Sequence, residues 1–198
     1  MVSKTREKLI EVARQLFAYK GMENTTMSDI ANASDKGRRT IYTYFKNKKE
    51  IYRAVLEKES EHLVERLRVI VDSDLNPTEK LMRFIDMRLD ILRENINHQR
   101  ATTNWRAFLV GEMKRVERVR SLAGEKELAM LKRILKEGQK SGDFLASNVP
   151  GAYTSLIILF HGIEISVVRN QLPQFGLEFN LMKQQLKQLI LSYLKQSN

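Results

Sequence analysis

The chain has 198 residues, 42% of them hydrophobic and 29% charged, which are the proportions of a folded globular protein and exclude a disordered chain. Because it has no cysteine, it has no disulfide, no thiolate metal site and no thiol nucleophile. The formal net charge is +10, and residues 1–53 hold twelve Lys and Arg against six Asp and Glu. This excess favours an anionic partner for the N-terminal quarter, although a solvated basic surface has the same composition.

The chain begins with two predicted helices. Apolar residues at helical spacing predict a helix over residues 4–19, and Gly21 is placed to end it. Thr26 stands three residues before Asp29, which is the spacing of a capping box. This pair therefore predicts the start of a short helix over residues 26–33.

A turn and a third helix follow. The run Ser34-Asp35-Lys36-Gly37 predicts a turn, because Asp and Gly tolerate left-handed backbone angles. Residues 38–44 then predict a helix of two turns, with Ile41 and Phe45 facing inward.

The remainder of the chain predicts longer helices. Capping signatures and apolar stripes place them over about residues 47–70, 76–96, 125–140, 149–170 and 179–194, with two shorter helices between 97 and 122 that break near Gly111. The middle of the helix over 149–170 is apolar all round, so we expect it to be buried on every side. Strand-like alternation is absent. We therefore predict an all-α protein with nine or ten helices.

Two short helices joined by a four-residue turn make a helix-turn-helix, whose second helix enters the major groove of DNA. The groove-facing positions of helix 38–44 are polar: Arg38, Arg39, Thr40, Tyr42, Thr43 and Tyr44. Arg can bond guanine through two hydrogen bonds, and Thr can contact thymine. We expect phosphate contacts from tyrosine hydroxyls, from Lys46, Lys48 and Lys49, and from Thr25, Thr26 and Ser28 at the start of helix 26–33.

This segment resembles the N-terminal signature of TetR-family (TetR/AcrR-type) transcriptional regulators. The runs from Thr25 to Ala31 and from Thr40 to Ile51 carry the resemblance, which covers roughly residues 5–55. The turn departs from the family pattern, with Asp35 and Lys36 in place of the usual Gly and small apolar residue. We expect Asp35 to adopt the backbone of the turn and Lys36 to add a phosphate contact. Arg39 also replaces a residue that is often small, so the operator sequence cannot be taken from a relative.

The resemblance implies a helix-turn-helix DNA-binding domain over residues 1–48 and a larger helical bundle over residues 49–198 that binds a ligand and dimerises. It implies a ligand-responsive, sequence-specific transcriptional regulator, expected to be a repressor that releases a palindromic operator when a small molecule binds. The alternative is an architectural or division-control DNA-binding protein of the same fold that responds to a protein partner.

The resemblance further implies a homodimer joined through its last two long helices, and their apolar character supports this. The candidate interface residues are Leu156, Leu159, Ile163, Val167, Met182, Leu186, Leu189 and Tyr193. The alternative is that they fill the core of the chain itself. A two-fold dimer would hold two reading helices about 34–36 Å apart, which predicts an inverted-repeat operator.

The small-molecule effector is expected within the body. The candidate pocket residues are Phe84, Met87, His98, Trp105, Phe108, Tyr153, Phe160, His161 and Glu164. The alternative is that the aromatic and Met residues are ordinary core. Glu164 shares a predicted face with Phe160 and His161, where its carboxylate could meet a cationic ligand. It could equally pair with Arg169 or with a basic residue of a partner chain.

A metal-dependent enzyme is the remaining class. His161 and Glu164 have the i, i+3 spacing of metal ligands in helical bundles, but such a site needs a second pair. Glu59 precedes His62 by three residues, but in the opposite order, and His98 has no acid three residues after it. We therefore expect no catalysis, no metal and no cofactor.

Targeting signals are also not expected. The N-terminal residues run directly into charged amphipathic sequence without an apolar signal-peptide core. The longest apolar run, from Leu156 to Phe160, is too short to span a bilayer. We expect a cytoplasmic protein that does not bind membranes.

Overall fold

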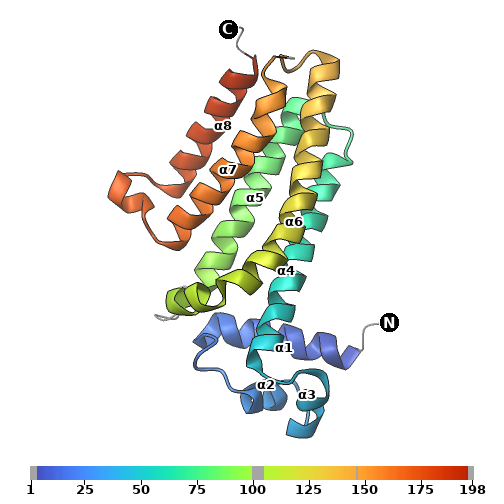
Figure 1. The fold of residues 1–198 in the computed structure, drawn as a ribbon, viewed down its shortest axis with the longest axis vertical. Helices are drawn as coiled ribbons and strands as arrows, with labels where there is room; N and C mark the ends of the chain where they lie inside the picture. Colours follow the sequence, from blue (N-terminus) through green and yellow to red (C-terminus); the bar gives the residue numbers. More distant parts are fainter. Residues whose placement is uncertain (1–3, 100–104, 146, 196–198) are drawn as a thin grey trace. The chain divides into compact units, whose positions relative to one another are not determined.

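The computed structural model describes residues 4–99, 105–145 and 147–195, without the side chains of 95–122 and 168. The helices are α1 (Lys4–Lys20), α2 (Met27–Ala33), α3 (Arg38–Tyr44), α4 (Lys48–Val71), α5 (Pro77–Gln99), α6 (Trp105–Ser141), α7 (Val149–Val168) and α8 (Phe179–Lys195), with a 3₁₀ turn at Leu172–Phe175 (Figure 1). No strand occurs in these described ranges, so the prediction of an all-α fold is confirmed there.

The chain divides into two compact units. The N-terminal unit comprises Met1–His62 and Asn95–Ser121, and the body unit comprises Leu63–Glu94 and Leu122–Asn198. The predicted domain boundary at residue 48 lies at the start of α4. The hydrophobic core of the N-terminal unit extends past this position. The first turns of α4 contribute Ile51 and Val55 to the same buried cluster as α1, α2 and α3.

The core of the N-terminal unit forms where the apolar faces of its helices meet. Its buried members are Leu9, Ile10, Ala13, Phe17, Ile30, Ala31, Ile41, Phe45, Ile51, Tyr52, Ala54 and Val55. Phe17 and Tyr52 meet edge to face, with ring centroids 5.8 Å apart, which is a favoured aromatic geometry. Gly21 ends α1 as predicted, with φ of 83°, and its N–H donates to the Phe17 carbonyl.

The largest departure from the sequence prediction is α6. A single helix runs from Trp105 to Ser141, so the predicted break near Gly111 and the predicted start at Glu125 are both wrong. An isolated glycine lowers helix propensity by only about 1 kcal/mol, which the rest of a long helix readily offsets. The predicted end is confirmed, because Gly142 follows with φ of 81°.

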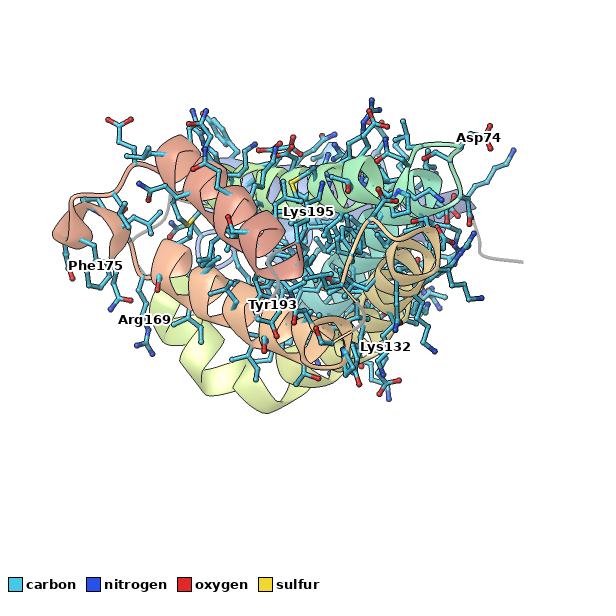
Figure 2. The ribbon with its side chains drawn as sticks, turned by 90° about the horizontal axis from the view of Figure 1, so that it is seen from above. Asp74, Lys132, Arg169, Phe175, Tyr193 and Lys195 are labelled. Atoms are coloured by element: carbon cyan, nitrogen blue, oxygen red, sulfur yellow. The ribbon has the colours of Figure 1, made fainter. Side chains whose placement is uncertain are left out.

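The body unit buries the apolar faces of α5, α7 and α8 and of the C-terminal part of α6. α7 and α8 lie side by side, and Figure 2 shows Phe175 at the outer end of the turn that joins them. At the other end, the backbone N–H of Leu145 donates to the Leu194 carbonyl, and the Asn148 amide donates to the Tyr193 carbonyl. α8 is also tied to α5, since Lys187 lies 2.6 Å from the Asp86 carboxylate.

The burial of α7 differs from the prediction that its apolar middle is enclosed. Leu156 and Phe160 are buried, but Ile158 is 66% exposed and Leu159 is exposed as well. By length and composition alone, Val149–Val167 is long and apolar enough to cross a membrane. The short apolar run from Leu156 to Phe160 does not by itself indicate this. One such helix is weak evidence for a membrane span. Only 22% of the stretch is buried within the chain, so α7 presents an apolar face that the described residues do not cover.

Candidate nucleic-acid interface

The interface begins with the start of α2, which local side chains define. The Thr26 hydroxyl accepts a hydrogen bond from the Asp29 N–H at 3.1 Å, and the Asp29 carboxylate accepts one from the Thr26 N–H at 2.7 Å. This reciprocal pair is the predicted capping box. Lys20 of α1 adds a third bond to the same carboxylate, at 2.8 Å.

These bonds change the acidity of Asp29. The Lys20 ammonium and then the Thr26 N–H and hydroxyl stabilise its charged form, which lowers the pKa of Asp29 to about 2. Because the pKa in the folded chain lies below the unfolded value of about 3.9, the stabilisation is present above that pH. It is lost as the pH falls through the folded value.

We therefore expect Asp29→Asn to lower the melting temperature at pH 7, and this difference from the unsubstituted chain to disappear between about pH 4 and pH 2. The matched control is Asp74→Asn. Figure 2 shows the Asp74 side chain projecting into solvent, and it makes no ion pair among the described residues. Thermal unfolding followed by circular dichroism across this pH range measures both. An Asp29→Asn melting curve that matches the control at pH 7 would contradict the pairing.

The turn between α2 and α3 satisfies its own polar groups. Asp35 adopts the left-handed conformation predicted for it, with φ of 56°. The buried hydroxyl of Ser34 donates to the Ala31 carbonyl at 2.9 Å, and the N–H of Lys36 donates to the same carbonyl. The turn is therefore held in one conformation, and it sets the direction in which α3 leaves it.

α3 has one buried face and one exposed polar face. Ile41 and Phe45 are buried in the core, as predicted. The exposed face carries Arg38, Arg39, Tyr42 and Thr43, and the half-buried Thr40 and Tyr44 flank it. Neither Arg38 nor Arg39 makes an ion pair among the described residues. This face therefore presents donors and acceptors of the kind that read base edges.

The residues that flank α3 differ in what they can reach. Lys46 is exposed, and Lys36 is half-buried. Lys48 is half-buried, and its ammonium donates to the Glu23 carbonyl at 3.1 Å, so it also braces the loop between α1 and α2. Burial is the main cause that lowers the pKa of Lys48.

The structure corrects one predicted contact at the start of α2. Thr25 is fully buried, and its hydroxyl donates to the Gly21 carbonyl at 2.6 Å, so the side chain cannot reach a phosphate. Thr26 is exposed but uses its hydroxyl in the capping box, and Ser28 is half-buried. Thr25 and Thr26 are adjacent identical residues, and only the packed structure distinguishes their roles.

Comparison with known proteins agrees with this geometry. The sequence pattern of the family described as "Bacterial regulatory proteins, tetR family" matches residues 9–55, which run from α1 into α4. The HTH-type transcriptional repressor KstR2 of Mycobacterium tuberculosis is 36% identical over 80 residues, 40% of this chain and 40% of that protein. The probable acrEF/envCD operon repressor of Escherichia coli is 45% identical over 49 residues, 25% of this chain and 22% of that protein.

Residues 9–55 of the chain therefore carry the sequence pattern of the tetR family.

A crystal structure of a TetR/AcrR-family regulator from Thermobifida fusca extends the likeness in fold to nearly the whole chain. The TM-score is 0.72 at 23% identity, over 96% of this chain and 97% of that one. The aligned segments of the two sequence relatives cover less than half of their lengths. Both of these relatives are named as repressors.

The predicted interface residues fall into two groups. Leu156, Val167, Met182 and Leu186 are buried within the chain and pack in its own core. Leu159, Leu189 and Tyr193 are exposed, and Ile163 is half-buried. Ile158, Ile165 and Leu181, which the sequence prediction does not name, are further exposed apolar residues of α7 and α8. Helical spacing alone does not show which side of an apolar helix faces the core.

The predicted pocket residues do not all face one interior. Phe84 and Phe160 are buried core, Met87 is half-buried, and His161 is exposed, so His161 and Phe160 do not share a face. Tyr153 is half-buried, with the Lys132 ammonium 4.6 Å from the centre of its ring. The side chains of His98, Trp105 and Phe108 lie outside the described part of the structure.

Glu164 has a partner that no local sequence pattern predicts. The Arg88 guanidinium donates to Glu127 at 2.7 Å and to Glu164 at 3.2 Å. The three side chains are at most 13% exposed, and the Phe160 ring centre lies 5.9 Å from the guanidinium carbon. Burial is the largest single influence on the pKa of Arg88 and lowers it, but the two carboxylates together raise that pKa. Glu164 therefore belongs to a buried ion network of α5, α6 and α7.

Proposed function

We propose that this chain is a sequence-specific DNA-binding transcriptional regulator of the TetR family. The observation that carries the proposal is α3. Its apolar face holds the helix in the core through Ile41 and Phe45, while Arg38, Arg39 and Tyr42 stand exposed on the other face. A short helix that is fixed on one side and polar on the other is suited to enter a major groove.

The proposal includes repression and release by a small molecule. The two sequence relatives described above are named as repressors, which supports the direction of regulation. Release of DNA on binding of an effector in the body unit is proposed from the likeness of residues 9–55 to the tetR family. A ligand can weaken DNA binding only if it binds more tightly to the conformation that fits the operator poorly.

The proposal also includes a homodimer formed through α7 and α8. Exposed apolar side chains gather on these two helices: Ile158, Leu159, Ile165, Leu181, Leu189 and Tyr193. Water-exposed apolar surface of this extent is typical of an interface that another molecule covers. A second copy would cover it symmetrically and present two α3 helices to an inverted-repeat operator.

Selection of bound sequences from a random pool of duplex DNA tests the proposed function. We expect the full chain to select an inverted repeat. Arg38→Ala and Arg39→Ala should each reduce discrimination at one base pair of each half-site by about 1–3 kcal/mol, because an arginine that bonds a base edge is lost. Tyr42→Ala and Lys46→Ala should weaken binding to all sequences and reduce the dependence of affinity on salt, because phosphate contacts release counterions.

Lys136→Ala is the matched control for charge, because it removes one exposed lysine from α6 in the body unit. Binding titrations at two salt concentrations separate base readout from phosphate contact. Unchanged DNA binding in all four variants of the N-terminal unit would overturn the proposed function. Selection of no sequence from the pool would overturn it as well.

A further inference from the structure

The first turns of α1 contact both ends of α3. At the N-terminal end, the Lys8 ammonium lies 3.1 Å from the carboxylate of Asp35, in the turn that leads into α3. At the C-terminal end, the Arg6 guanidinium carbon lies 5.2 Å from the ring centre of Phe45, the residue that caps α3. Two side chains less than one turn apart on α1 therefore bracket the helix.

Asp35 is in an unusual place for a non-glycine residue. Its φ of 56° is one that glycine adopts without steric cost, so nothing in the backbone geometry requires a side chain there. The carboxylate has a use, however, because it supplies the partner for Lys8. With glycine at this position, the turn would have no side-chain contact to α1 at this point.

The Arg6 contact acts on a residue that is fixed in position. Phe45 is buried in the core, and its N–H donates to the Ile41 carbonyl at 2.9 Å, which closes the last turn of α3. A cation over an aromatic ring is attracted to the ring face, so Arg6 holds this end of α3 against α1.

Neither contact is strong, since the ion pair is exposed to solvent and to salt. Its consequence for stability is therefore small. Base readout is more demanding than stability, because hydrogen bonds to base edges tolerate only a few tenths of an ångström, whereas phosphate contacts only position the protein. A small change in the tilt of α3 would therefore reduce discrimination between sequences before it reduced affinity for DNA in general.

We propose that Lys8, with Asp35, and Arg6 are positioning residues that hold the two ends of α3 in the orientation that reads base sequence, without touching the bases themselves. This inference rests on the proposed function. It concerns the selectivity of DNA binding and not its existence.

The test compares the affinity of the full chain for the selected operator with its affinity for unrelated duplex DNA of the same length. The variants are Lys8→Gln, Asp35→Asn, the double variant and Arg6→Gln. Asparagine is chosen at position 35 because it also tolerates the left-handed backbone. Lys4→Gln is the matched control, since it removes an exposed charge from the same turn of α1.

The measured ratio is the affinity for operator divided by the affinity for unrelated DNA. We expect each single variant to lower it by about two- to fivefold for each N-terminal unit of the proposed dimer. The double variant should be no worse than either single variant, because both remove the same contact. Lys8→Arg should keep the ratio of the unsubstituted chain, because it keeps the charge. Each variant should change the melting temperature by no more than Lys4→Gln does. A general charge effect predicts something different: Lys8→Gln would weaken and Asp35→Asn would strengthen binding to both DNAs, with the ratio unchanged.

An unchanged ratio in the single variants, or additive losses in the double variant, would overturn the positioning role. The failure of the proposed function is distinguishable, because then the unsubstituted chain itself would show no preference between operator and unrelated DNA.

Discussion

Replacement of Arg88 by alanine is expected to lower the free energy of unfolding by about 3–5 kcal/mol, because it removes the buried cation that bonds Glu127 and Glu164. Glu127 and Glu164 both bond the Arg88 guanidinium and are almost completely buried. A buried carboxylate that loses its hydrogen-bonded guanidinium has less compensation for its lost hydration. Urea unfolding followed by circular dichroism measures the change.

Arg83→Ala is the control for this substitution, because Arg83 is an exposed arginine on the same helix, α5. We expect it to change the free energy of unfolding by less than about 0.5 kcal/mol. Glu127→Gln should be milder than Arg88→Ala, since the amide oxygen can still accept from the guanidinium. A loss below about 1 kcal/mol for Arg88→Ala would show that water or rearrangement compensates the carboxylates.

Replacement of Ile158 by glutamate is expected to convert the proposed dimer to a monomer. Operator binding should then weaken by about 10²- to 10⁴-fold, because the two N-terminal units no longer bind the operator as parts of one dimer. Ile158 is 66% exposed on the apolar face of α7. A charge placed at the centre of an apolar interface must lose its hydration when the interface forms. Sedimentation velocity measures the oligomeric state, and titration with operator DNA measures the affinity.

Val69→Glu is closely matched to Ile158→Glu, since Val69 is also 66% exposed but lies on α4. We expect Val69→Glu to remain dimeric and to bind operator as the unsubstituted chain does. If both variants remain dimeric, the interface does not use this face of α7. If both become monomeric, the effect is one of added charge and not of position.

The helices α1, α2 and α3 were predictable to within a residue or two because their boundaries depend on local chemistry. The capping box of Thr26 and Asp29, the left-handed Asp35 and the end of α1 at Gly21 each involve residues within five positions of one another. Such contacts form in the same way whatever the remainder of the chain does. The exposed polar face of α3 follows from the same periodicity that buries Ile41.

The remainder of the chain was less predictable, since its features depend on contacts distant in sequence. Arg88 and Glu164 are 76 positions apart, so no local pattern pairs them. Glycine disfavours helix and so predicts a break near Gly111, yet α6 continues through it. The apolar stretch of α7 did not reveal that one side packs on the body unit while Ile158 stands exposed.

The amino-acid sequence by itself determined the all-α class, the helix-turn-helix and the polar residues that α3 presents, because spacing along one helix decides which residues share a face. Only the tertiary structure decided that Thr25 is buried, that Asp35 pairs with Lys8 and that Glu164 pairs with Arg88. The physical reason is that the burial and pairing of a side chain depend on which other elements pack against it, and that packing is a property of the whole folded chain.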